Sequence, residues 1–339
     1  MAVENRDNWI DWAKAIGIFL VVWGHIPLNN ESSMVTAFIY SFHMPLFFFI
    51  SGYLFKIIPS FKQETQKGFK ALIIPYLIYQ LLIYPYWLTK ELITSDSGFQ
   101  VYNLIVSPVI QSLLANPING ATWFVVCLFF MKLTANLILR RKQALLYIAI
   151  SCTFAISLYW YLNSQNLLRV NVTDRFLSLL LFFFLGYICK QKNMITYMIN
   201  KPKTNCMLLL TSVIITLIIN SISYQVSCTS FYDIAMFYTV GISGSLMVIS
   251  IGIFLNHVKS HIIYQLSIGT LVILGTHCMF IGIINFAFEK YLHIPNVSYS
   301  SSVSLAIALS IMAITYPVIL FCKKYCPILL GKSSLKTIQ

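Results

Sequence analysis

The sequence predicts an all-α, polytopic membrane protein with about ten transmembrane helices and with both termini in the cytoplasm. Three observations predict this class. The 339 residues are 58% hydrophobic and 10% charged, with a mean hydropathy of +0.77, whereas soluble domains carry roughly a quarter charged residues. The apolar residues gather in runs of about 20, the length that a helix needs to cross a bilayer. The charged residues lie mostly in the short segments between these runs.

Ten apolar runs are long enough to be spans, and polar or basic segments separate each from the next. In chain order, we predict spans at residues 9–28, 35–58, 71–88, 121–139, 144–162, 174–190, 206–222, 231–255, 262–286 and 303–322. The run 101–115 is shorter and contains Pro108, so we expect it to be re-entrant or interfacial. We therefore expect residues 1–332 to form one transmembrane domain and residues 333–339 a short cytoplasmic tail.

The basic residues predict the orientation. Of the 23 Lys and Arg, 18 fall in segments on one side of the predicted spans, one (Lys14) lies within a span, and four lie on the other side: Lys90, Arg169, Arg175 and Lys290. Cytoplasmic loops of membrane proteins carry the excess of Lys and Arg, which places both termini in the cytoplasm. The net charge of +13 is thus a topology signal, and we expect membrane lipids rather than nucleic acid as partners.

The positions of the cysteines and the charges in the first apolar run argue against a disulfide-rich secreted protein. Five of the eight cysteines lie within apolar runs, and Cys228 alone is expected on the outer side, so no disulfide framework is predicted. We expect no cleavable signal peptide, because the first apolar run contains Asp11 and Lys14 and no small-residue cleavage site follows it. No metal site is predicted.

The first predicted span contains three ionisable side chains: Asp11, Lys14 and His25. Each costs at least about 2.5 kcal/mol at bilayer depth, which makes each a candidate functional residue. On a helix the three share a stripe roughly 40 to 60° wide, and His25 lies roughly 21 Å along the axis from Asp11. This face predicts a polar path. Alternatively, Asp11 and Lys14 neutralise each other at the interface, with Lys14 snorkelling, and His25 is solvated or satisfied in the core.

The stretch "SFHMPLFFFISGYLF" in the second predicted span raises a similar choice. His43 falls at a depth within reach of His25, and Pro45 frees a backbone carbonyl, which membrane helices tolerate where other groups or a cavity satisfy it. Ser51 and Gly52 permit close approach of a ligand or of another helix. We expect these residues to face an internal cavity, although His43 alone and a Ser-Gly pair alone are more often structural.

Three further positions carry weaker signals. His277 falls at a depth similar to that of His25, but depth does not establish contact. Trp123, at the outer start of the fourth span, is either an interfacial belt residue, which we rank first, or a platform on which a sugar stacks. Lys67 and Lys70, in "KQETQKGFKALIIPY", suit phosphate as adjacent point charges, or they are ordinary cytoplasmic anchors.

These motifs resemble a known family. The stretch "RDNWIDWAKAIGIFLVVWGH", followed by "SFHMPLFFFISGYLF", resembles the opening of the acyltransferase 3 family of integral-membrane O-acyltransferases, in particular its fucose 4-O-acetylase-like branch. The pieces "KALIIPY", "ATWFVVCLFF", "LLFFFLGYICK", "IGTLVILGTHC" and "PILLGK" are similar to later parts of that family, so the resemblance runs from residue 7 to about residue 332.

The resemblance implies roles for individual residues. His25 matches the family's first-helix histidine, which is thought to act in catalysis, and Asp11 with Lys14 matches its Asp-x-x-Arg or Asp-x-x-Lys pair. Lys67 and Lys70 match a basic motif thought to hold the coenzyme phosphates, where many members have arginine, and lysine lacks the bidentate fork of arginine. We therefore expect Asp11 and His25 to be catalytic, and Lys14, Lys67 and Lys70 to bind the coenzyme.

The expected function is that of a bacterial inner-membrane O-acyltransferase. The resemblance implies transfer of an acyl group, commonly acetyl, from acyl-CoA to a sugar hydroxyl of a cell-envelope polysaccharide or its lipid-linked precursor, with no permanently bound cofactor. His25 serves as general base or carries the acyl group covalently. His43, Ser51 and Trp123 are candidate acceptor-binding residues, with His43 orienting the acceptor or the developing oxyanion.

A transporter or flippase for a sugar or a lipid-linked glycan is the competing class. Ten spans, polar groups inside the membrane and a proline within a span also fit that class. The sequence shows no inverted repeat in its support.

Overall fold

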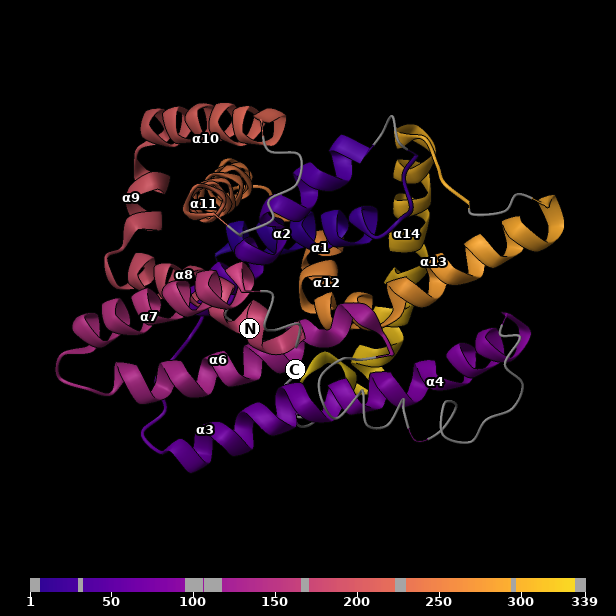
Figure 1. Cartoon of the computed structure of the whole chain (residues 1–339), viewed down its shortest axis with the longest axis horizontal. Helices are drawn as coiled ribbons and strands as arrows, with labels where there is room; N and C mark the ends of the chain where they lie inside the picture. The colour runs from indigo at the N-terminus through magenta and orange to yellow at the C-terminus, as the bar shows by residue number, and fades with distance from the viewer. Residues whose placement is uncertain are drawn as a thin grey trace.

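The computed structural model describes residues 7–29, 33–94, 106, 118–165, 171–222, 230–293 and 297–332. In this part of the chain all named secondary-structure elements are helices or helical turns (Figure 1). In order these are α1 (Asn8–Gly24), α2 (Ser33–Tyr53), α3 (Phe61–Gly68), the π-helical turn η2 (Phe69–Ile73), α4 (Ile74–Thr94), the 3-10 turn η4 (Gly120–Thr122), α6 (Trp123–Leu139), α7 (Ala144–Ser164), α8 (Asn171–Gln191), α9 (Met194–Asn200), α10 (Pro202–Ile222), α11 (Phe231–Phe254), α12 (His261–Ile268), α13 (Thr270–Leu292), α14 (Ser301–Tyr325) and the 3-10 turn η5 (Pro327–Leu330).

The prediction of an all-α polytopic membrane protein is confirmed. Within the described ranges, nine helical segments are long and apolar enough to cross a membrane, and α1, with 17 residues, is shorter than any of them. The run 101–115, apart from Val106, the tail 333–339 and Cys228 lie outside the described residues. The seven cysteines that the structure describes are all free thiols.

Two predicted spans differ from the observed helices. The third is longer than expected, because α3, η2 and α4 form one apolar helical segment, Phe61–Ile93. The ninth is interrupted at Gly269, which separates α12 from α13. A side chain at Gly269 would collide with Ile319 of α14. The break between α12 and α13 therefore packs closely against α14.

The first helix lies at the centre of the fold. Helix α1 packs against α2, α11, α12, α13 and α14, and Figure 1 shows it near the middle of the molecule with α2, α12 and α14 around it. One core cluster joins α1 with α13 and α14, a second joins α1 with α2 and α11, and a third joins α6, α7 and α8. The polar stripe of α1 is therefore enclosed by protein.

Helix α2 continues through Pro45 to Tyr53. The proline ring lies next to Gly241 of α11, which leaves room for it. Further along, α2 and α8 approach closely, because Gly52 packs on the carbonyl of Phe183 and Gly186 packs on the carbonyl of Phe49. Small residues allow this kind of backbone contact between membrane helices.

A π-helical turn, η2, interrupts the α3–α4 segment just before Pro75. Proline has no N–H, so Pro75 cannot donate a hydrogen bond to the carbonyl oxygen of Ala71, four residues earlier. Turns of π-helix are frequent at functional sites. Gly331, with a positive φ of 72°, lies against the same carbonyl. This contact holds Gly331, the residue that follows η5, beside η2.

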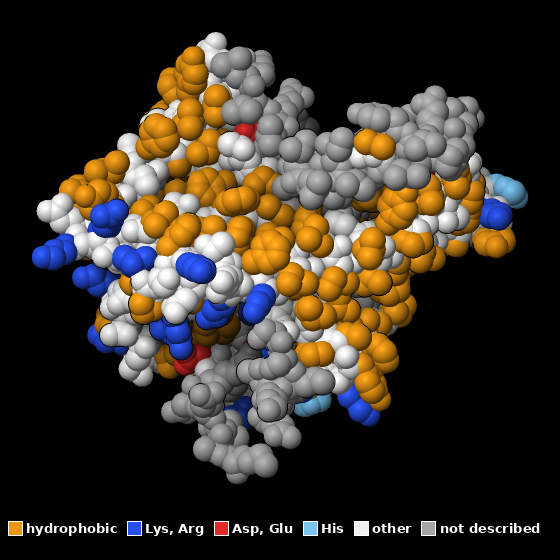
Figure 2. All heavy atoms as spheres, turned by 90° about the horizontal axis from the view of Figure 1, so that it is seen from below, with side chains coloured by type: hydrophobic (Ala, Val, Ile, Leu, Met, Phe, Trp, Pro, Cys, Tyr) orange, Lys and Arg blue, Asp and Glu red, His pale blue; other side chains and the backbone are white. Residues whose placement is uncertain are grey.

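The surface has the charge distribution of a membrane protein. In Figure 2 hydrophobic side chains cover most of the described surface, whereas most visible Lys and Arg gather towards its left end. Exposed apolar residues include Leu81, Phe154, Met207 and Leu309 on four different helices. Such exposure is expected where the solvent is lipid.

Candidate functional site

His25 is the residue that caps the C-terminus of α1. Its Nδ1 atom lies 2.7 Å from the carbonyl oxygen of Val21. A carbonyl oxygen can only accept a hydrogen bond, so Nδ1 carries the proton and donates. The other ring nitrogen, Nε2, then holds a lone pair, and it makes no hydrogen bond with any described residue. The backbone of α1 thus selects the tautomer in which Nε2 can accept a proton.

His43 and Tyr40 face His25 from α2. His43 is 5% exposed and donates from Nδ1 to the carbonyl oxygen of Ile39 at 2.9 Å, so its Nε2 also holds a lone pair. The Tyr40 ring lies 5.8 Å from the His25 ring and 5.1 Å from the His43 ring, between centroids. Tyr40 therefore links the two histidines that the sequence places on separate spans.

A cavity of about 410 Å³ contains this cluster. His25, Tyr40, His43 and Pro45 line it. The remaining lining residues come from α1, α2, η4, α6, α7, α8, α11 and α13: Val21, Met44, Gly120, Ala121, Trp123, Tyr159, Arg175, Ser178, Leu179, Phe237 and Leu274. The void has the size of a small-ligand site.

Trp123 lies inside the protein and not in an interfacial belt. It is 9% exposed and lines the cavity. The guanidinium carbon of Arg175 lies 4.0 Å from the centre of its ring, and Phe48 stacks on it at 6.4 Å. The indole is thus packed against a cation and a phenyl ring, which limits the ring surface that a sugar could cover.

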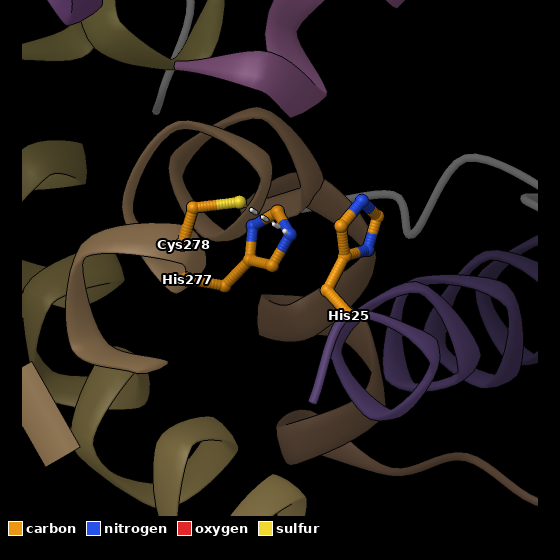
Figure 3. A group of neighbouring side chains, drawn as sticks. All are labelled: His25, His277 and Cys278. Atoms are coloured by element: carbon orange, nitrogen blue, oxygen red, sulfur yellow. Dashed lines mark hydrogen bonds between the residues drawn. The ribbon is translucent and has the colours of Figure 1, made fainter. Parts of the chain in front are cut away.

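His277 of α13 touches His25. The two ring centroids are 4.9 Å apart with an interplanar angle of 78°, and Figure 3 shows the rings side by side. His277 is fully buried and donates from Nδ1 to the carbonyl oxygen of Ile273 at 2.9 Å. The thiol of Cys278 lies 3.4 Å from its Nε2. Depth alone did not establish this contact, and the fold provides it.

The ligand atoms of His25, His277 and Cys278 lie within 4.8 Å of one another, so the three side chains could hold a metal ion. The observed contacts also explain why these three side chains lie together, without a metal ion. A Cys278 thiol that donates to His277 leaves no lone pair on that imidazole for a metal. We therefore treat Cys278 and His277 as a hydrogen-bonded pair, against which the His25 ring packs.

Asp11 and Lys14 lie elsewhere, at the other end of α1. The hydroxyl of Ser267, in α12, donates to Asp11 Oδ1, and Lys14 Nζ donates to the Ser267 carbonyl oxygen. Neither residue lines the cavity of His25; Asp11 lines a separate pocket of about 640 Å³ together with His261. The structure therefore joins α1 to α12 through both side chains, and it does not bring Asp11 near the imidazole.

Ser51 is also absent from the His25 cavity. Its neighbour Gly52 is buried against α8, which matches the helix-packing alternative for this pair. Within the stretch "SFHMPLFFFISGYLF", His43 and Pro45 line the cavity. Gly52, further along the same helix, packs against α8.

Lys67 and Lys70 line a pocket of about 670 Å³. Gln63 and Gln66 of α3 and Lys332 after η5 complete its polar lining. Sequence spacing indicated the first two lysines, whereas Lys332 comes from the opposite end of the chain. Three ammonium groups and two amides around one void form a site suited to phosphate.

Comparison with known proteins identifies the family. The family model described as an acyltransferase domain, acyltransferase 3, matches residues 7–322. The chain belongs to the acyltransferase 3 family. Nodulation protein NolL of Mesorhizobium japonicum is 28% identical over 165 residues, which span 45% of this chain and 42% of that relative. No solved structure matches the chain. The match with NolL thus spans less than half of that relative's length, and membership of the acyltransferase 3 family does not establish its fucose 4-O-acetylase-like branch.

Two residues that line the cavity, Arg175 and Tyr40, are not among the candidates predicted from the sequence. The sequence places Arg175 at the outer start of a span, and Tyr40 is one of many tyrosines in apolar runs. An arginine at the second position of the predicted span 174–190 is the signal that could have identified Arg175.

Proposed function

We propose that this acyltransferase moves an acyl group from acyl-CoA to a hydroxyl of a carbohydrate, with His25 as general base. The carbohydrate is a cell-envelope polysaccharide or its lipid-linked precursor, and the protein works in the bacterial inner membrane. The observation that carries the proposal is the tautomer of His25, which leaves the lone pair of Nε2 available in a 410 Å³ cavity. General-base catalysis requires such a nitrogen near the reacting hydroxyl.

His25 accepts and then returns the one proton that the reaction transfers. The hydroxyl oxygen attacks the thioester carbonyl while its proton passes to Nε2, and a C–O bond forms. The C–S bond then breaks, and the imidazolium returns the proton to the leaving sulfur. The products are an ester and the free thiol of CoA, and His25 ends in its starting state.

The acyl donor enters from the predicted cytoplasmic side. The pocket of Lys67, Lys70 and Lys332 suits the phosphates of the coenzyme. In this proposal the thioester arm extends from the pocket between the helices towards His25. Asp11 and Lys14 hold α1 to α12 through Ser267 and so keep the first helix in register, which is a positioning role.

The acceptor occupies the His25 cavity. His43, whose Nε2 holds a lone pair, accepts a hydrogen bond from a second hydroxyl of the sugar and orients it. Tyr40 closes the wall between the two histidines. Orientation of this kind supplies a large part of the rate in a two-substrate transfer.

Membranes that contain the protein, incubated with radiolabelled acetyl-CoA and the host's own envelope glycan, test the proposal. We expect label in the glycan and release of CoA in equal amounts. A His257→Ala variant, changed in a turn outside the cavity, serves as the control for His25→Ala. Glycan movement across the membrane without consumption of acetyl-CoA would contradict the proposal and favour the transporter.

A further inference from the structure

Arg175 places a guanidinium group in the wall of the His25 cavity. It lies in the first turns of α8, and the cavity that it lines also contains His25, Tyr40 and His43. The proposed reaction steps above do not use it. An arginine in a membrane protein interior is costly, and such residues mark ligand or ion sites by default.

Among the residues that the structure describes, none forms an ion pair with Arg175. The residues that line the cavity include no Asp or Glu. Asp174, its neighbour in the sequence, influences it electrostatically, but Arg175 makes no ion pair with any described residue. The guanidinium carbon lies 4.0 Å from the centre of the Trp123 ring. A cation–π contact attracts the cation but does not use its five N–H donors, and within the described ranges no residue accepts a hydrogen bond from them.

The contact with Trp123 also fixes the guanidinium in position. Trp123 is buried and stacks on Phe48, so the ring itself cannot move freely. A guanidinium held against an aromatic ring face can still direct N–H donors towards a planar or tetrahedral anion. The group is therefore pre-organised, which lowers the entropy lost on binding.

We propose that Arg175 binds an anionic group of the acceptor, a carboxylate or a phosphate, so that the enzyme selects an acidic carbohydrate. This inference rests on the proposed function, because it assigns the acceptor to the His25 cavity. The coenzyme phosphates are assigned to the separate pocket of Lys67 and Lys70, which leaves Arg175 for the other substrate. Trp123 is then a positioning residue for Arg175.

A competing role for Arg175 is to stabilise the oxyanion that develops on the thioester carbonyl. The two roles differ in measurable ways. Binding of an acceptor anion affects the acceptor Kd and KM, and the effect disappears when the acceptor is neutral. Stabilisation of the oxyanion affects kcat equally for every acceptor.

The experiment compares three forms of the host's envelope glycan: native, carboxyl-reduced and dephosphorylated. Binding to the detergent-solubilised protein is measured without acyl-CoA, and transfer is measured with it. The variants are Arg175→Gln, Arg175→Lys and, as a matched control, Lys290→Gln, which removes an outer-side cation that does not line the cavity. Thermal unfolding of each variant checks that the fold is retained.

We expect the wild type to bind native glycan about tenfold or more tightly than the form that lacks the relevant anion. Arg175→Gln should bind all three forms equally weakly, Arg175→Lys should recover part of the affinity, and Lys290→Gln should behave as the wild type. The chemically modified form that loses affinity identifies the anion as carboxylate or phosphate.

Equal binding of the three forms by the wild type would overturn the proposal, as would an Arg175→Gln variant whose kcat falls equally on all of them. The outcomes for the two hypotheses are separable. Charge-dependent binding without acyl transfer would refute the proposed function alone, and transfer that does not depend on acceptor charge would refute the role of Arg175 alone.

Discussion

The imidazole rings of His25 and His277 meet edge to face at 4.9 Å, although they lie on helices 252 positions apart in the chain. His277 is fully buried, and its Nδ1 proton is held by α13. It therefore forms a fixed surface against which the His25 ring rests. We interpret His277 as a positioning residue for the base.

His277→Ala should lower the rate of acyl transfer about tenfold to a hundredfold, because the His25 ring gains freedom to leave its reactive orientation. The KM for acyl-CoA should change little, since the lysine pocket is separate. Initial rates at varied donor concentration measure both. A loss as complete as that of His25→Ala would assign the base role to His277 or to both histidines.

The double variant Lys67→Ala, Lys70→Ala should raise the KM for acyl-CoA about tenfold or more and leave kcat nearly unchanged, because two ammonium contacts to phosphate are lost. Lys62→Ala is the matched control, since Lys62 is exposed on the same helix but does not line the pocket. If donor dependence is unchanged in the double variant, the lysines are only cytoplasmic anchors.

The cavity can be filled without disturbing the backbone. A Cβ atom at Gly120 would meet nothing within 4 Å, and Gly120 lines the His25 cavity. Gly120→Phe should therefore block acceptor binding while thermal stability is retained, and Gly120→Ala should be active. Transfer assays and unfolding curves for the two variants test this, and an active Gly120→Phe enzyme would mean that the acceptor binds elsewhere.

The spans, the histidines at similar depth and the two lysines could be predicted from the sequence, because each depends on local hydrophobicity or spacing. The contacts between helices could not. His277 reaches His25 only because α1 packs against α13, and Lys332 joins Lys67 only because η5 returns to η2. Ser51 was predicted to line the cavity but does not, and its neighbour Gly52 packs against α8; a single sequence does not specify which helix becomes the partner.

The cluster of Cys278 and the two histidines gives a test of metal dependence. Because the hydrogen bond from the Cys278 thiol accounts for the cluster, chelation with EDTA or 1,10-phenanthroline should leave acyl transfer unchanged. Cys278→Ser should keep most of the activity, since a hydroxyl can donate to His277 Nε2 in place of the thiol. Loss of activity on chelation, restored by added zinc, would show that His25 is a metal ligand and not a base.

The most direct test of the account is the transfer rate of His25→Ala with and without added imidazole. We expect the variant to insert and unfold like the wild type and to transfer acetyl at less than about one hundredth of the wild-type rate. It should regain measurable activity when imidazole enters the cavity left by the missing ring. A His25→Ala enzyme with full activity would contradict the assignment of His25 as the base.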